Sequence, residues 1–243
     1  MAICTRCRQP FPAKIVLELA MAAIVLAQPS PILVAAGDTN DVFSPCSDAK
    51  VQKSDGFTFG IAISSKDSFF HDQVQLSPCD RRLGLAGSNA QLAVFRSKVD
   101  ELSLLTINNS SSSPAEAGGY MVAFAGRQYA ARSAPALVSN DSHIITSFTL
   151  VLEFQKGSLQ NLFWKNFGCD SCSGQSVCID GQGCGVPNSN CGSGGCNIGI
   201  QLAFSGTDRN ENVLNSWYEV KNLRQYSLFG LYSDLKDRFM APF

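Results

Sequence analysis

The sequence predicts an all-β protein: an antiparallel, jelly-roll-like β-sandwich that carries a disulfide-rich loop. Two observations predict this fold class. Apolar residues alternate with small or polar residues in four separate segments, and clusters of Gly, Pro and Ser interrupt the 243-residue chain between them. Period-2 alternation places apolar residues on one face of a half-buried strand. Many short strands separated by turns are typical of sandwiches and jelly rolls.

The four alternating segments are the expected strands, and they lie at 57–63, 120–124, 148–154 and 198–204. Their apolar members are Phe57, Phe59, Ile61 and Ile63; Tyr120, Val122 and Phe124; Phe148, Leu150, Leu152 and Phe154; and Ile198, Ile200, Leu202 and Phe204. The polar residues 155–158 predict a hairpin turn between the third strand and the apolar run 159–164.

One further segment of the sequence fits either a helix or strands, and another fits a short helix. Residues 91–107 have helical spacing from Leu92 to Leu102 and strand alternation from Leu102 to Thr106. We favour strand, because the rest of the chain is β and neighbouring strands often decide such ambiguous segments. Residues 231–239 have the spacing of a short helix.

Residues 1–36 predict a secretory signal peptide. A basic start with Arg6, Arg8 and Lys14 precedes the apolar run 15–27, and small residues end at Ala36. An uncleaved anchor is the alternative, but a span requires about 20 uninterrupted apolar residues. Glu18 lies within this run, and Gln28 and two prolines follow it. We therefore expect one secreted β-rich domain at 37–243, with no membrane association after cleavage.

The cysteines of the mature chain predict four disulfides, because an even number in an oxidising compartment favours complete pairing. They are Cys46, Cys79, Cys169, Cys172, Cys178, Cys184, Cys191 and Cys196. Six of them lie in 169–196 with seven glycines and two charged residues, a segment that needs crosslinks to hold its shape. Cys46 and Cys79 are the natural remaining pair, whereas the pairing inside 169–196 stays open.

Other interpretations of the cysteine-rich segment fit less well. A zinc ribbon needs a second cysteine pair at matching spacing, and a thioredoxin-like motif has few other cysteines nearby. A chitin-binding module uses exposed aromatic rings, and residues 169–196 contain none. We expect neither a metal nor a cofactor.

The charge balance bears on the partner. The chain has 19 Lys and Arg against 20 Asp and Glu, which argues against nucleic acid because phosphate binding requires clustered cations. Nucleophile-elbow, phosphate-loop and zinc-protease motifs are absent from the sequence. His71 and His143 are interpreted as a strand end and a loop residue. A glycan hydrolase needs only two suitably spaced carboxylates, but no feature of the sequence selects such a pair.

Polysaccharide is the partner that the residue types favour. Exposed aromatic rings stack on sugars, although aromatic residues at strand spacing usually pack in a core instead. The candidates are Trp164, Trp217, Tyr218, Tyr226 and Tyr232. Trp217 and Tyr218 would face opposite sides of a strand, so at most one would belong to the core.

Four arginines are a weaker candidate for a polysaccharide site. Arg81, Arg82, Arg127 and Arg132, with Tyr129 among them, are consistent with a patch for an anionic polysaccharide such as pectin. Isolated arginines of this kind are more often solvated or paired with carboxylates, and we take that as the main interpretation.

Three glycosylation sequons open at Asn108, Asn109 and Asn140, in segments with the composition of surface loops. We expect modification of Asn140 and of one residue of the adjacent pair.

Several sequence runs add a resemblance that extends over residues 37–238. They are Asp55-Gly-Phe-Thr-Phe-Gly60, Ser77-Pro-Cys-Asp-Arg-Arg-Leu83, Gly118-Gly-Tyr-Met-Val-Ala-Phe-Ala-Gly-Arg127, Thr149-Leu-Val-Leu-Glu-Phe-Gln-Lys-Gly157 and Asn215-Ser-Trp-Tyr-Glu-Val220. Together they resemble a family of secreted plant proteins labelled "expp". The resemblance implies a plant extracellular or cell-wall protein and no particular reaction. We expect non-catalytic polysaccharide binding, with a glycan hydrolase as the alternative.

Overall fold

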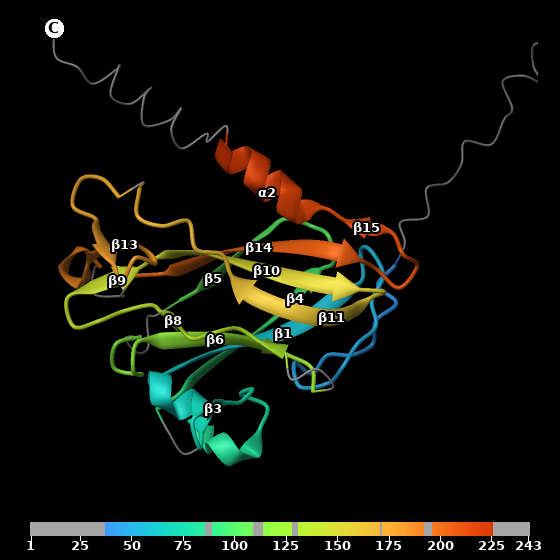
Figure 1. Cartoon of the computed structure of the whole chain (residues 1–243), viewed down its shortest axis with the longest axis horizontal. Coiled ribbons are helices and arrows are strands. Elements are labelled where there is room, and N and C mark those ends of the chain that lie inside the picture. Colours follow the sequence, from blue (N-terminus) through green and yellow to red (C-terminus); the bar gives the residue numbers. More distant parts are fainter. Residues whose placement is uncertain are drawn as a thin grey trace, which may run out of the picture. The chain divides into compact units, whose positions relative to one another are not determined.

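Two β-sheets pack face to face, and their inner faces form the main hydrophobic core (Figure 1). The computed structural model describes residues 37–85, 89–108, 114–127, 131–170, 172–191 and 196–225. The predicted signal peptide, the predicted helix at 231–239, and Asn109, Tyr129, Tyr226 and Tyr232 lie outside these ranges. Within them the predicted all-β, disulfide-rich fold is confirmed.

The first sheet has the order β4–β1–β6–β7, and β8 also pairs with β6. Its strands are β1 (Gly56–Ser64), β4 (Gln91–Lys98), β6 (Tyr120–Ala125), β7 (Ala131–Arg132) and β8 (Ala136–Leu137). The second sheet has the order β11–β10–β14–β15, and β5 also pairs with β14. Its strands are β5 (Ser103–Ile107), β10 (Ser147–Gln155), β11 (Ser158–Trp164), β14 (Ile198–Thr207) and β15 (Val213–Leu214).

Smaller elements lie around the sandwich. β9 (His143–Ile145), β12 (Val177–Ile179) and β13 (Gly183–Pro187) form a three-stranded sheet, and β2 (Phe70–His71) pairs with β3 (Val74–Gln75). The described helices are α2 (Ser216–Gln225) and the short 3-10 helices η1 (Lys66–Phe69), η2 (Arg81–Leu83) and η4 (Asn188–Asn190). None of the described helices is long and apolar enough to cross a membrane.

The predicted apolar alternation builds the main core in β1, β10 and β14, whereas in β6 the predicted residues Val122 and Phe124 lie on the opposite face, and Met121 and Ala123 line the main core instead. Phe57 and Phe154 meet between the sheets with their rings edge to face, 5.0 Å between centroids. The prediction of a half-buried strand is wrong for β1, which is buried on both faces. A second cluster of Phe69, Val122 and Phe124, against which Cys46 and Cys79 pack, covers its outer face. The Phe124 ring fills the space above Gly60, where any Cβ would collide with it.

The ambiguous segment 91–107 is strand, as expected, and forms β4 and β5. One pairing departs from the antiparallel expectation: β10 and β14 run parallel, from Ser147 opposite Gly199 to Phe154 opposite Gly206. Parallel strands need a long crossover, which the chain supplies through β11 and the cysteine-rich segment.

Trp217 and Tyr218 were expected on a strand, and this expectation is wrong because both lie in α2. The beginning of the helix is held by a distant side chain. Asp100 Oδ1 accepts hydrogen bonds from the backbone N–H groups of Asn215 (2.6 Å) and Ser216 (2.8 Å). A carboxylate at a helix N-terminus supplies an acceptor that the helix itself lacks, and it interacts favourably with the helix dipole.

All eight cysteines of residues 37–243 form disulfides. Cys46 pairs with Cys79, Cys169 with Cys178, Cys172 with Cys184, and Cys191 with Cys196. Two of these bonds tie residues 169–172 to the β12–β13 hairpin, and β13 pairs with β9. The cysteine-rich segment is therefore joined to the sandwich by backbone hydrogen bonds as well as by the chain.

Candidate functional site: an arginine-lined groove

The four arginines identified in the sequence line one cavity of about 530 Å³. We call it the arginine groove. One wall is formed by residues 74–77 and 79–82, and the other by Gly126, Arg127 and Arg132. Arg81 and Arg127 are therefore brought together from positions far apart in the sequence.

Local sequence explains how the first wall presents its arginines. Asp80 caps η2 by accepting a hydrogen bond from the backbone N–H of Arg82 (3.0 Å), and Gly84 ends η2 in the left-handed conformation (φ 61°). Both are preferred residues for these positions. The order Asp-Arg-Arg-Leu-Gly thus makes a short turn that exposes two guanidinium groups.

The second wall follows the end of β6. The backbone N–H of Gly126 donates to the Pro45 carbonyl (2.9 Å), and that of Arg127 donates to Asp48 Oδ1 (2.8 Å). Gly126 has φ 72°, and a Cβ there would collide with the Asp48 carboxylate. Glycine is therefore required at the point where the chain turns to present Arg127. Arg132 lies opposite Phe124 in the β6–β7 pair.

Asp80 neutralises one of the arginines. Its carboxylate accepts hydrogen bonds from Arg82 Nε (3.0 Å) and Nη2 (2.7 Å). These side-chain bonds, together with the Arg82 backbone N–H, lower the pKa of Asp80 to about 2. The same contact raises the pKa of Arg82. Asp80 is therefore ionised at any pH at which the protein would function.

The groove nevertheless keeps an excess of positive charge. Four arginines and one aspartate give its lining a formal charge of +3. Within the described ranges, neither guanidinium group of Arg81 and Arg127 makes a hydrogen bond or an ion pair, and both residues are exposed. Val74, which is 57% exposed, and Leu76 add apolar surface beside these charges. An anion with an apolar face would match this arrangement.

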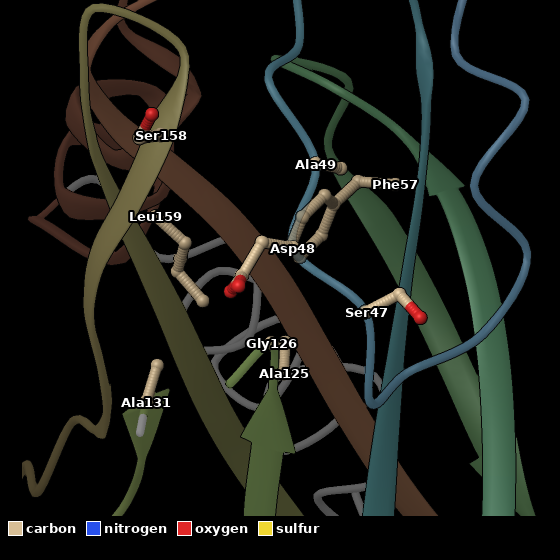
Figure 2. Close-up of a pocket in the computed structure, with 9 residues that line it drawn as sticks. All are labelled: Ser47, Asp48, Ala49, Phe57, Ala125, Gly126, Ala131, Ser158 and Leu159. Carbon is tan, nitrogen blue, oxygen red and sulfur yellow. The ribbon is translucent and has the colours of Figure 1, made fainter. Parts of the chain in front are cut away.

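A second hollow lies next to the groove and shares Gly126 with it. Its volume is about 20 Å³, enough for a water molecule but not for a sugar. Figure 2 shows the Asp48 carboxylate directed into this hollow towards Leu159, whereas the Ser47 hydroxyl points away. Asp48 therefore lies between the small hollow and the second wall of the groove.

None of the described candidates for sugar stacking lines the groove, and these candidates do not form one platform. Trp164 is half-buried and meets Phe148 edge-on at 5.7 Å. Trp217 lies 6.5 Å from Phe167, and Tyr218 is 58% exposed in α2. Tyr226 and Tyr232 are outside the described residues. Trp164 thus packs in the sandwich, and Tyr218 is the one described candidate whose ring is largely exposed to solvent.

The carboxylates give no support to a catalytic pair in the described part of the chain. Asp55 and Asp208 are fully buried, and each accepts several hydrogen bonds from surrounding backbone and side chains. Among the described residues, three carboxyl groups have clearly shifted pKa values, those of Asp38, Asp80 and Asp208, and all three are lowered. A general acid for glycan hydrolysis needs a raised pKa.

The remaining residues considered in the sequence are the two histidines and the asparagines of the glycosylation sequons. His71 ends β2 and lies 2.9 Å from Asp72, whereas His143 opens β9 instead of lying in a loop. Asn108 and Asn140 are both exposed. Among the described residues, no cluster of three or more His, Cys, Asp or Glu side chains could hold a metal ion.

A family model described as "Uncharacterised protein DDB_G0273449" matches residues 14–239. The chain belongs to this family. No curated protein and no solved structure matches the chain. The family match covers the whole sandwich and both walls of the groove, but its description assigns no activity. The resemblance to secreted plant "expp" proteins stays a prediction.

Sequence reasoning identified the four arginines but missed the residues that arrange them. Asp48 and Asp80 were not selected because aspartate is a common surface residue, and Val74 was not selected because it stands alone among polar neighbours. A usable signal was present for Asp80: it follows Cys79 directly, so the expected Cys46–Cys79 bond brings it close to residues 45–48.

Proposed function

We propose that the protein is a secreted, extracellular or cell-wall protein that binds acidic polysaccharide, without catalysis, in the arginine groove. The observation that carries this proposal is the convergence of four arginines on one cavity, in whose described lining Asp80 is the single carboxylate. A guanidinium group forms paired, charge-assisted hydrogen bonds with a carboxylate, so uronate residues suit the exposed Arg81 and Arg127.

Two further observations support the proposal. Four disulfides are typical of secreted or extracellular proteins, where polysaccharide of this kind is found. Val74 and Leu76 offer apolar surface to the C–H face of a sugar ring, while the arginines that line the same cavity would bind its carboxylate. The groove therefore suits a charged sugar better than a free inorganic anion.

The first prediction tests the charge of the groove. We expect the oxidised protein, residues 37–243, to bind polygalacturonate in titration calorimetry and to bind neutral xyloglucan much more weakly. The double variant R81A/R127A should lose about tenfold or more in affinity, since two charge-assisted contacts are removed. Raising the ionic strength from about 0.05 M to about 0.5 M should weaken binding of the unaltered protein, because exposed charges are screened.

The matched control is K50A/K165A. It removes two exposed cations that do not line the groove, so its net charge equals that of R81A/R127A. Equal losses in the two double variants would show that net charge alone attracts the polymer, and the groove would then be rejected as the site. Equal binding of xyloglucan would also contradict the proposal.

The alternative function, a glycan hydrolase with a carboxylate pair, is tested in the same samples. Incubation with each polysaccharide followed by measurement of reducing ends detects cleavage directly. We expect no increase over the polysaccharide alone. Steady release of reducing ends would replace the binding proposal with the hydrolase.

A further inference from the structure

We infer that the Cys46–Cys79 disulfide and the Asp48 carboxylate are positioning groups that hold the two walls of the arginine groove in their binding arrangement. This inference rests on the proposed function. It concerns a short segment, residues 45–48, that we call the strap. None of the four strap residues carries a positive charge, so the strap would act through geometry and not by attracting the ligand.

The strap is joined covalently to the first wall. Cys46 bonds to Cys79, a residue of the groove lining, with 5.5 Å between their Cα atoms. Asp80 and the two arginines of η2 follow Cys79 directly. The position of Arg81 and Arg82 therefore depends on where Cys46 is held.

The strap is joined to the second wall by hydrogen bonds. Pro45 accepts from the N–H of Gly126 at 2.9 Å, and Asp48 accepts from the N–H of Arg127 at 2.8 Å. These bonds fix the chain at the residue where it leaves β6. The path from Arg81 to Arg127 thus runs through Cys79, Cys46 and Asp48.

Another contact joins the walls, but at the other end of the first wall. Gln75 Nε2 donates to the Ser133 carbonyl (2.7 Å), and Ser133 is itself bonded to Ala123 in β6. This contact holds β3. The η2 end, which carries the arginines, begins after the turn at 77–80 and is tied to the second wall through the strap.

The disulfide is separate from the main core. Cys46 and Cys79 pack against the smaller cluster of Phe69, Val122 and Phe124, whereas Cys191 and Cys196 pack against the main core between the sheets. Removing the Cys46–Cys79 bond should therefore loosen the strap while the sandwich stays folded. Comparing variants that lack one or the other of these two disulfides therefore distinguishes an effect on binding from an effect on stability.

The decisive experiment uses Asp48, because geometry and electrostatics predict opposite signs there. Asp48 is an anion beside the groove, so its removal would by charge alone strengthen binding of an anionic polymer. If Asp48 instead positions Arg127, then D48A weakens binding of polygalacturonate although it removes a negative charge. D48N keeps an oxygen acceptor for the Arg127 N–H and should restore binding to at least that of the unaltered protein.

We expect D48A to lower the affinity about tenfold. A loss of this size corresponds to a second wall that adopts its binding arrangement in about a tenth of the molecules, because apparent affinity falls in proportion to that fraction. The variant C46S/C79S should show a loss of similar size, and C191S/C196S should bind like the unaltered protein. Melting temperatures measured on the same samples report whether each variant is folded. Should C46S/C79S not fold, the comparison of D48A with D48N decides alone.

The outcomes separate this inference from the proposed function. If the unaltered oxidised protein fails to bind polygalacturonate, the proposed function is wrong. If it binds, and D48A and folded C46S/C79S bind equally well or more tightly, the function stands and the positioning role is wrong. Weaker binding by D48A with recovery in D48N supports the positioning role.

Discussion

Asp208 is a buried carboxylate whose hydrogen-bonding capacity is used by the chain around it. It accepts from the backbone N–H groups of Lys53 (3.0 Å), Asn210 (2.8 Å) and Asn212 (2.8 Å), and from the side chain of Asn212 (3.1 Å). Burial alone would raise its pKa, but the hydrogen bonds from Lys53 and Asn212 outweigh burial and hold the pKa below its ordinary value of 3.8. Asp208 therefore joins the chain before β1 to the loop between β14 and β15.

The lowered pKa makes a prediction about acid stability. A group with a lower pKa in the folded than in the unfolded chain stabilises the fold above its unfolded pKa, and this contribution is lost as the pH falls through the folded value. The free energy of unfolding should therefore decrease below about pH 4. D208N leaves buried N–H groups without a matching acceptor, so we expect its free energy of unfolding to be lower by about 2 kcal/mol or more at pH 7. Since the variant lacks the titrating carboxyl group, its free energy of unfolding should also decrease less as the pH falls. Urea unfolding between pH 7 and pH 2 measures both. Parallel curves for the two proteins would contradict the role given to Asp208.

At the scale of elements, the alternation of apolar residues predicted strands well, because a strand that lines a core must place every second side chain inside. It could not predict that β1 is covered on both faces, since the covering residues, such as Phe69 and Phe124, come from other parts of the chain. It also could not predict the parallel pairing of β10 with β14, because alternation is the same in either direction. Residue patterns within a segment therefore indicate the element but not its neighbours.

The helix α2 illustrates the same limit and allows a test. Its first N–H groups are satisfied by Asp100, more than 100 positions away in the sequence, and Asp100 also lies 2.7 Å from Lys53 Nζ. Asp100 has φ 66°, a conformation that Asp and Asn tolerate better than Ala does. We expect D100A to lose about 2 kcal/mol, from the lost cap and the strained backbone together.

The control for this test is D100N. It keeps an oxygen acceptor for the helix N–H groups and tolerates the positive φ, and it loses the charge and the acceptor oxygen that face Lys53. Urea unfolding should therefore rank D100N between the unaltered protein and D100A, and far-UV circular dichroism should show reduced helix signal for D100A. Equal stability of D100A and the unaltered protein would show that α2 does not depend on this carboxylate.

At the scale of the whole molecule, the sequence named the charged residues of the candidate site only as a minor candidate patch. Solvation or pairing with carboxylates was the main interpretation of Arg81 and Arg127. Their convergence depends on a disulfide, on the glycine at position 126 and on the Asp48 hydrogen bond, which together define the groove. Long-range contacts of this kind are set by the folded chain and leave no periodic signal in the sequence.

The secretory route, which the whole molecule's disulfides favour, makes the last prediction. A chain expressed from Met1 in a eukaryotic secretory host should lose residues 1–36 and carry N-linked glycan at Asn140 and at one residue of the pair Asn108 and Asn109. Asn108 and Asn140 are both exposed, so both are accessible to the transferase. Two glycans on adjacent residues would collide, which is why we expect one from the pair.

Intact-mass measurement tests this prediction in three steps. Treatment with an N-glycosidase should lower the mass by the two glycans, and N140Q should lose one of them. Reduction of the deglycosylated protein should then add eight hydrogens, two for each of the four disulfides. An N-terminus at Met1 or thiols that label before reduction would contradict passage of this chain through the secretory route, and an unchanged mass after glycosidase would contradict the predicted glycosylation. Labelling of Cys46 and Cys79 in the native protein would show that the bond between them is absent. Such protein should bind polygalacturonate weakly, because this bond positions the walls of the proposed groove.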